Sequence, residues 1–82
     1  MEAEIREILA EHARLPVDMG DLDDNADLYQ AGMTSHASVS VMLALEDAFD
    51  IEFPESMLRK GTFESVSAIS AALTSLVGAP AE

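Results

Sequence analysis

The residues of this 82-residue chain that could bind a metal ion lie in an acidic segment before its middle. Oxygen-bearing side chains stand there at alternate positions, as in an EF-hand calcium loop: Asp21, Asp23, Asn25 and Asp27. The pattern fails where that loop is most specific, because Ala26 replaces the turn glycine and Gly32 replaces the bidentate glutamate. Asx-type turns in a solvated loop explain these side chains better. An acidic calcium-binding or interaction module therefore stands only as a remote alternative, and no metal site is expected.

Two adjacent pairs of polar residues could instead be catalytic. Ser35-His36 would be the nucleophile and base of a hydrolase, but neighbours on a helix point about 100° apart and cannot form that hydrogen-bonded pair. The other histidine, His12, falls in the first predicted helix as a surface or boundary residue. Glu46-Asp47 could act as acid and base, but nothing nearby predicts the burial that would tune them. The sequence therefore predicts no catalytic residue and no enzyme.

Ser35 has a further possible role that depends on its place in the chain. It follows a long loop and Gly32, and it falls in the first turn of a predicted helix. A helix N-terminus presents free N–H groups and a partial positive charge, which suit a phosphate group. From its position alone, Ser35 could equally be a residue that only helps to cap the helix.

The elements that must position Ser35 begin with a helix and a long loop. The first helix is predicted over residues 2–14, and Pro16 blocks its continuation. Its buried positions are Ile5, Ile8, Leu9 and Ala13. The loop over residues 15–33 has a length that is uncommon unless a loop is functional. Apolar residues should hold it to the core: Leu15, Val17, Leu22, Leu28 and Met33.

The second helix is predicted over residues 35–49, with Thr34 as its N-cap. Its apolar face is expected at Val39, Met42, Leu43, Leu45 and Phe49, extended by Val41 and Ala44. Acidic residues gather at its end and oppose the helix dipole, so local helix stability does not explain them: Glu46, Asp47 and Asp50.

The rest of the chain predicts an extended link over residues 51–54, a short helix over 55–60 and a last helix over 63–77. Met57 and Leu58 should face inward, and Thr62 should cap the last helix, with Glu64 in its first turn. The buried stripe of that helix should be Phe63, Val66, Ile69, Leu73 and Leu76, with Gly78 and Pro80 ending it. The sequence thus predicts one all-α domain over residues 1–82, a four-helix bundle of three main helices and one short helix.

The amino-acid composition limits the classes of partner that we expect. The net charge is −12, from 16 acidic and 4 basic residues, so nucleic acid and anionic membrane surfaces are not expected to bind. Self-repulsion favours a monomer, and the charge could equally steer the chain toward basic partners. Cysteine is absent, the N-terminus lacks a signal-peptide pattern, and no apolar run is long enough for a bilayer. A cytoplasmic location is the expectation.

Residues 27–55 resemble the prosthetic-group helix of acyl and peptidyl carrier proteins. The matching residues are Asp27-Leu28, Gly32-Met33, Ser35, Val39, Leu43, Leu45-Glu46, Phe49-Asp50-Ile51 and Pro54, and Thr62 to Val66 resemble the family's entry to its last helix. The resemblance implies the acyl carrier protein fold and a covalent 4'-phosphopantetheine arm on Ser35. It also implies a partner transferase that uses magnesium to deliver this arm from coenzyme A. The thiol of the arm would hold a cargo as a thioester.

The departures from the family pattern bear on the cargo. Thr34-Ser35-His36 stands where the family usually has Asp-Ser-Leu, and positions that are acidic in fatty-acid carriers are uncharged at Thr34, Ala37 and Ser40. This variant is similar to small bacterial carriers of an amino acid, of the glycine or alanine class. Their ATP-dependent ligases resemble a truncated seryl-tRNA synthetase, and a downstream acceptor enzyme takes the cargo. An acyl carrier for fatty-acid or polyketide-type synthesis remains the alternative. The expected recognition surface is Met33, Thr34, His36, Ala37, Ser40, Val41, Glu46 and Asp47, with Met33 and Val41 equally expected in the core.

Overall fold

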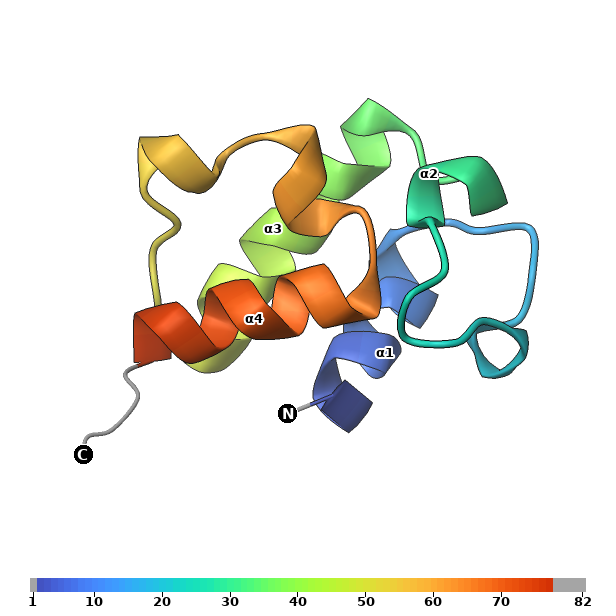
Figure 1. The fold of residues 1–82 in the computed structure, drawn as a ribbon, viewed down its shortest axis with the longest axis horizontal. Coiled ribbons are helices and arrows are strands. Elements are labelled where there is room, and N and C mark those ends of the chain that lie inside the picture. The colour runs from blue at the N-terminus through green and yellow to red at the C-terminus, as the bar shows by residue number, and fades with distance from the viewer. Residues whose placement is uncertain (1, 78–82) are drawn as a thin grey trace.

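The computed structural model describes residues 2–77, and the regular elements within that range are all helices. The α-helices are α1 (Glu2–His12), α2 (Leu28–Ala31), α3 (Ser35–Phe49) and α4 (Val66–Val77). Short 3₁₀ helices cover Met19–Asp21, Glu55–Met57 and Lys60–Phe63. Helix α1 packs against both α3 and α4, and the segment over 55–63, yellow to orange in Figure 1, lies at the upper left of that view. The prediction of an all-α four-helix bundle is confirmed, although the short α-helix lies in the first loop.

The core gathers the apolar stripes of the three long helices. Leu9 of α1, Leu45 of α3 and Leu73 of α4 are fully buried. Phe53 and Phe63 close one end with an edge-to-face contact, their ring centroids 5.2 Å apart. The other buried apolar residues are Ile5, Ala13, Met19, Leu28, Met33, Ala37, Val41, Val66 and Ile69.

Helix α3 has the bounds that the sequence predicts, whereas α1 ends earlier than expected. The Thr34 hydroxyl caps α3 as predicted, and Asp50 ends it with a left-handed backbone at φ 54°. Helix α1 stops at His12 rather than at residue 14, because Arg14 also adopts a positive φ of 55°. The chain therefore turns away before Pro16 is reached.

The predicted apolar face of α3 is wrong at two positions. Val39 is 51% exposed and Leu43 is 55% exposed. The buried stripe consists of Ala37, Val41 and Leu45, spaced four residues apart. Residues 41–45 are apolar without interruption, so hydrophobic spacing could not select the side that faces the core.

The region between α3 and α4 also differs from its prediction. Two 3₁₀ helices replace the short helix expected over 55–60, and Leu58 is 48% exposed instead of facing inward. Helix α4 begins at Val66 rather than at residue 63, because Ser65 caps it: the Ala68 N–H donates to Ser65 Oγ at 3.0 Å. Thr62 and Phe63 belong to the preceding 3₁₀ helix, and Glu64 follows it. The expected ending at Gly78 and Pro80 lies outside the described residues.

The long first loop is ordered by contacts to α1 and α4. Arg6 of α1 pairs with Asp24 at 2.6 Å and donates to the Met19 carbonyl at 2.8 Å. The Ser67 N–H donates to the Asp24 carbonyl at 2.9 Å. Met19 is buried, but Val17 is 44% exposed, so its expected role as an anchor is wrong. The loop thus reaches α3 from a fixed direction.

Candidate functional site

Ser35 is the first residue of α3, and its side chain is exposed. The Thr34 hydroxyl accepts the Ala37 N–H at 3.0 Å, which fixes the start of the helix one residue before Ser35. Within the described part of the chain, the Ser35 hydroxyl has no hydrogen-bond partner, and only the Ser35 carbonyl is engaged, by Ser38 Oγ at 2.7 Å. The cap is therefore Thr34, and the hydroxyl of Ser35 is free to react.

The approach to Ser35 is shaped by the short helix α2 and by Gly32. The Asp27 carboxylate caps α2 by accepting the Tyr29 N–H at 2.9 Å. Gly32 ends α2 with φ 126°, a backbone conformation that residues other than glycine rarely adopt. A Cβ at this position would also lie 2.6 Å from Pro16 Cδ. Glycine is therefore required both by its backbone angle and by the chain that passes beside it.

The local charge around Ser35 suits an anion. No acidic residue lies in the first turn of α3. The Thr34 hydroxyl engages the Ala37 N–H, and the N–H groups of Ser35 and His36 have no acceptor within residues 2–77. These two free donors and the positive end of the helix dipole would favour a phosphodiester on the Ser35 oxygen.

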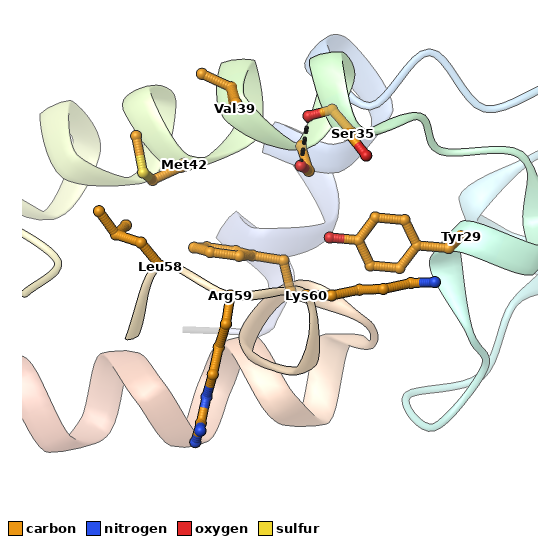
Figure 2. Close-up of a pocket in the computed structure, with 9 residues that line it drawn as sticks. Tyr29, Ser35, Val39, Met42, Leu58, Arg59 and Lys60 are labelled. Carbon is orange, nitrogen blue, oxygen red and sulfur yellow. Dashed lines mark hydrogen bonds between the residues drawn. The ribbon is translucent and has the colours of Figure 1, made fainter. Parts of the chain in front are cut away.

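Ser35 lies at the edge of an open hollow of about 380 Å³, here called the Ser35 groove. Figure 2 shows α3 above this groove and the chain at Leu58, Arg59 and Lys60 below it. The Lys60 Nζ lies 4.9 Å from the centroid of the Tyr29 ring, a cation–π contact that joins the lower wall to α2. The full lining is Tyr29, Ser35, Ser38, Val39, Met42, Leu58, Arg59, Lys60 and Phe63.

Sequence reasoning missed the lower wall of the Ser35 groove. It expected Leu58 in the core, and it gave no role to Arg59 or Lys60. A signal was nevertheless present, because this adjacent pair supplies half of the 4 Lys and Arg residues of the chain. Both residues line the Ser35 groove, but Figure 2 shows the Arg59 side chain pointing away from Ser35, and the Lys60 ammonium lies over the Tyr29 ring.

The residues predicted to recognise partners do not form one surface. The prediction is corrected for Ala37, which is only 4% exposed, while Met33 and Val41, 3% and 0% exposed, take the core position that was equally expected for them. Thr34 and His36 are exposed next to Ser35. Ser40 and Asp47 line a separate hollow between α1 and α3.

Glu46 serves the fold. Its Oε2 accepts the Phe53 N–H at 2.9 Å and so holds the link that follows α3. This hydrogen bond explains an acidic residue near the end of α3 that the helix dipole alone disfavours. Glu46 is only half-buried, so the same carboxylate does not by itself exclude partner contact.

The carboxylates of the first loop cap turns. Asp18 accepts the Gly20 N–H at 3.3 Å, Asp23 accepts the Asn25 N–H at 3.0 Å, and Asp24 pairs with Arg6. The bonds of Asp18 and Asp23 are the Asx-type turns that the sequence suggested, whereas Asp24 forms an ion pair. Among residues 2–77, no three His, Asp or Glu side chains are grouped so that they could hold a metal ion. In the same range, no helix has the length and apolar character required to cross a membrane.

Known proteins resemble this chain in both sequence and structure. A protein-family model described as a phosphopantetheine attachment site matches residues 3–73. An aminoacyl carrier protein of Agrobacterium fabrum is 52% identical over 69 residues, which cover 84% of this chain and 83% of that protein.

Solved structures also resemble this chain. One match, with a TM-score of 0.88 and 49% identity, covers 90% of this chain and 99% of the other. It comes from a crystal structure of an engineered Bradyrhizobium japonicum glycine:[carrier protein] ligase complexed with carrier protein from Agrobacterium tumefaciens and AMP. Another comes from the Bradyrhizobium japonicum ligase complexed with glycylated carrier protein, with a TM-score of 0.74 and 25% identity over 87% of this chain and 95% of the other.

Proposed function

Because the chain belongs to the family of proteins with a phosphopantetheine attachment site, we propose that Ser35 is the serine that carries the arm. We further propose that the thiol of the arm carries an amino acid as a thioester. The observation that supports the first step is the free, exposed Ser35 hydroxyl at the head of α3, with the cap supplied by Thr34 instead. No other described serine stands at the start of α3.

The residues around Ser35 fit a phosphopantetheine group. The Ser35 and His36 N–H groups would face its phosphate, and Arg59 and Lys60 would stand on the same groove. Val39, Met42 and Leu58 offer apolar surface along which the rest of the arm could lie. Once attached, the arm supplies the thiol that a chain without cysteine lacks. The protein itself contributes an exposed hydroxyl, a positive helix end and a rigid body.

The amino-acid cargo rests on the relatives. The Agrobacterium protein that is 52% identical is an aminoacyl carrier protein, and two structural matches come from complexes with a glycine:[carrier protein] ligase. An amino acid on a thioester keeps a charged ammonium group, which loses solvation in an apolar hollow. Such a cargo would therefore stay in water, where a partner enzyme can reach it.

The proposed sequence of events needs three partner enzymes, and this chain catalyses none of the steps. A phosphopantetheinyl transferase joins the Ser35 oxygen to the phosphorus of the pantetheine phosphate of coenzyme A, and adenosine 3',5'-bisphosphate leaves. An ATP-dependent ligase, of the kind that resembles a truncated seryl-tRNA synthetase, then loads the thiol. A downstream enzyme accepts the cargo. The use of coenzyme A and ATP favours a cytoplasmic setting.

The test uses unmodified protein, coenzyme A and a phosphopantetheinyl transferase of broad specificity. Intact-mass spectrometry should show the gain of one phosphopantetheine group, and Ser35→Ala should abolish this gain. Ser38→Ala is the matched control, because Ser38 lines the same groove, and it should still be modified. Modification that persists in folded Ser35→Ala would overturn the assignment.

The cargo is tested on the modified protein with ATP, glycine and the Bradyrhizobium japonicum glycine:[carrier protein] ligase. We expect a further mass increase of one glycyl group, which hydroxylamine should release because a thioester is labile to it. A second candidate, an acyl carrier, is favoured by the apolar wall of the Ser35 groove. A fatty acyl mass on the carrier isolated from its own cells would establish that alternative and reject the amino acid.

A further inference from the structure

Lys60 is the only lysine of the chain, and it lines the same groove as Ser35. The other basic residue of the groove is Arg59, whose guanidinium stays protonated and does not act as a nucleophile. Cysteine is absent from the chain, and the hydroxyl groups in the groove are weak nucleophiles without a base to activate them. An acyl group brought into this groove would therefore meet a single reactive amine, that of Lys60.

The side chain of Lys60 is held by an aromatic ring and not by a carboxylate. Its Nζ lies 4.9 Å from the centroid of the Tyr29 ring. Within residues 2–77, Lys60 Nζ forms no ion pair and no hydrogen bond, although the chain has 16 acidic residues. A cation–π contact of an exposed lysine is weak, so the amine can leave the ring readily.

The walls of the groove place this amine near the proposed arm. Figure 2 shows Ser35 above the Tyr29 ring and the Lys60 side chain below it. Lys60 begins the 3₁₀ helix that ends at Phe63, and its side chain is exposed to solvent. A reactive group on a flexible tether reaches an effective concentration of roughly 1 mM at a nearby site. A thioester at the end of an arm on Ser35 would thus meet the Lys60 amine repeatedly.

We propose that Lys60 is an acceptor site for the aminoacyl group of the arm, so that the loaded carrier slowly acylates itself. This inference rests on the proposed function, because only a loaded arm on Ser35 brings a thioester to the groove. The neutral amine of Lys60 attacks the carbonyl carbon of the thioester. The C–N bond forms, the C–S bond breaks, and the sulfur leaves with the electron pair and takes the proton that the nitrogen gives up.

The products of this transfer are an amide on Lys60 and a free thiol on the arm. Resonance stabilises the amide, so the aminoacyl group does not return to the sulfur. The thiol can be loaded again, whereas the glycyl group on Lys60 stays in place. Lys60 is in this way a modification site that records earlier loading of the same chain.

Tyr29 slows the transfer. The face of its ring attracts the ammonium form of Lys60, whereas only the neutral amine attacks a carbonyl carbon. The ring also lies between Ser35 and the Lys60 side chain in the view of Figure 2. The contact between Tyr29 and Lys60 therefore prolongs the lifetime of the thioester on the arm.

The experiment uses the full chain with glycine loaded on its phosphopantetheine arm, at about pH 8.5, where lysine amines have a larger neutral fraction than at pH 7. Intact mass first establishes loading, and hydroxylamine then releases every glycyl group held as a thioester. We expect a glycyl mass that resists hydroxylamine, grows with time and is assigned to Lys60 by peptide mass spectrometry. Lys60→Arg, which keeps a cation beside the ring, should abolish it.

Two outcomes separate this inference from the proposed function. If hydroxylamine releases the whole glycyl mass of a loaded carrier, self-acylation is rejected and the Ser35 assignment stands. If no glycyl group is loaded in the first step, the proposed cargo is rejected, and this inference with it. A stable glycyl group that is found equally on the N-terminal amine would reject Lys60 as the acceptor site.

Further variants test whether the transfer stays within one chain and whether Tyr29 slows it. Ser35→Ala protein, which has no arm, should gain the stable glycyl group at least about tenfold more slowly when mixed with loaded protein at micromolar concentration. Tyr29→Leu should speed the transfer about threefold, whereas Tyr29→Phe, which keeps a ring, should not. Equal acylation of the Ser35→Ala chain, or an unchanged rate in Tyr29→Leu, would overturn the proposal.

Discussion

The two grooves that flank α3 differ in charge and in what the sequence revealed about them. The Ser35 groove is lined on its far side by Lys60, whose ammonium lies over the Tyr29 ring, and by Arg59, which points away from Ser35 in Figure 2. The α1–α3 groove, the hollow between those two helices, is instead lined by Glu11 and Asp47 around Leu43 and Ala44. Both grooves expose one large aliphatic side chain of α3, Val39 on the first and Leu43 on the second. One helix can therefore present an anion-favouring surface at its start and a cation-favouring surface toward its end.

The separation along α3 makes this difference useful. Ser35 and Asp47 lie about 18 Å apart along the helix axis, well beyond the range over which exposed charges influence each other in physiological salt. The charges near the two ends of α3 therefore act almost independently of each other. The contrast depends on α3 remaining rigid and on its start being fixed, and each of these conditions can be tested.

The largest expected effect comes from the core beneath both grooves. Leu45→Ala should lower the free energy of unfolding by about 3 kcal/mol, because Leu45 is fully buried. Leu43→Ala, on the same helix, should cost about 0.5 kcal/mol or less, because Leu43 is mostly exposed. Urea denaturation of both variants measures the difference. Similar losses would show that Leu43 is covered and that the α1–α3 groove is not an open surface.

The second-largest expected loss of stability comes from Gly32, which ends α2 in the segment before Ser35. Gly32→Ala should cost about 2 kcal/mol, because φ is 126° and the new Cβ would press against Pro16. Gly61→Ala is the control, with no atom within 4 Å of the added Cβ, and should change stability by about 0.5 kcal/mol or less. Thermal unfolding followed by circular dichroism compares the two. A tolerated Gly32→Ala would mean that the approach to α3 is not fixed by this glycine.

Glu46 and Asp47 are neighbouring carboxylates near the end of α3, and we expect them to contribute differently to stability. Glu46→Ala should cost about 1.5 kcal/mol, because the Phe53 N–H loses its acceptor. Asp47→Ala removes a similar charge without a hydrogen bond and should be neutral or slightly stabilising. The difference between the two losses in free energy of unfolding, measured by urea denaturation, reports mainly the hydrogen bond of Glu46. A destabilising Asp47→Ala would give Asp47 a structural role that its contacts within residues 2–77 do not explain.

The smallest effect concerns the cap beside Ser35. Thr34→Ala should cost about 1 kcal/mol, because the Ala37 N–H loses its acceptor, and Thr34→Ser should restore most of the loss. Both variants should still accept phosphopantetheine on Ser35, as intact mass would show. Loss of modification in folded Thr34→Ser would indicate that the threonine methyl contacts the transferase.

The fold was predictable from the sequence where the residues at both ends of a helix favour the same bounds. The bounds of α3 follow from a threonine that can cap it and an Asp50 that tolerates the left-handed conformation. The start of α4 was not predictable in the same way, since Thr62 and Ser65 are both good caps. Tertiary contacts decide between them: the Leu28 N–H donates to the Glu64 carbonyl, and the Ser67 N–H donates to Asp24. Such contacts cannot be read from neighbouring residues.

Within the candidate site, Ser35 was predictable from the sequence, but the residues that line the rest of the Ser35 groove were not. Ser35 follows from its motif and its position, and the family match confirms the resemblance that identified the motif. The exposure of Val39, Leu43 and Leu58 could not be predicted, because apolar residues occur on nearly every side of α3 and in the segment after it. Tertiary packing, chiefly of α3 against α1, determines which residues of α3 are buried.

The aspartates that cap the first loop have a consequence for protein engineering. Asp18, Asp23 and Asp27 each accept a backbone N–H through one carboxylate oxygen, a task that the amide oxygen of asparagine performs equally well. Their geometry and their charge are therefore separable. Replacing them one at a time with asparagine should lower the net negative charge of the protein in single steps, while the hydrogen bonds that shape the loop are kept.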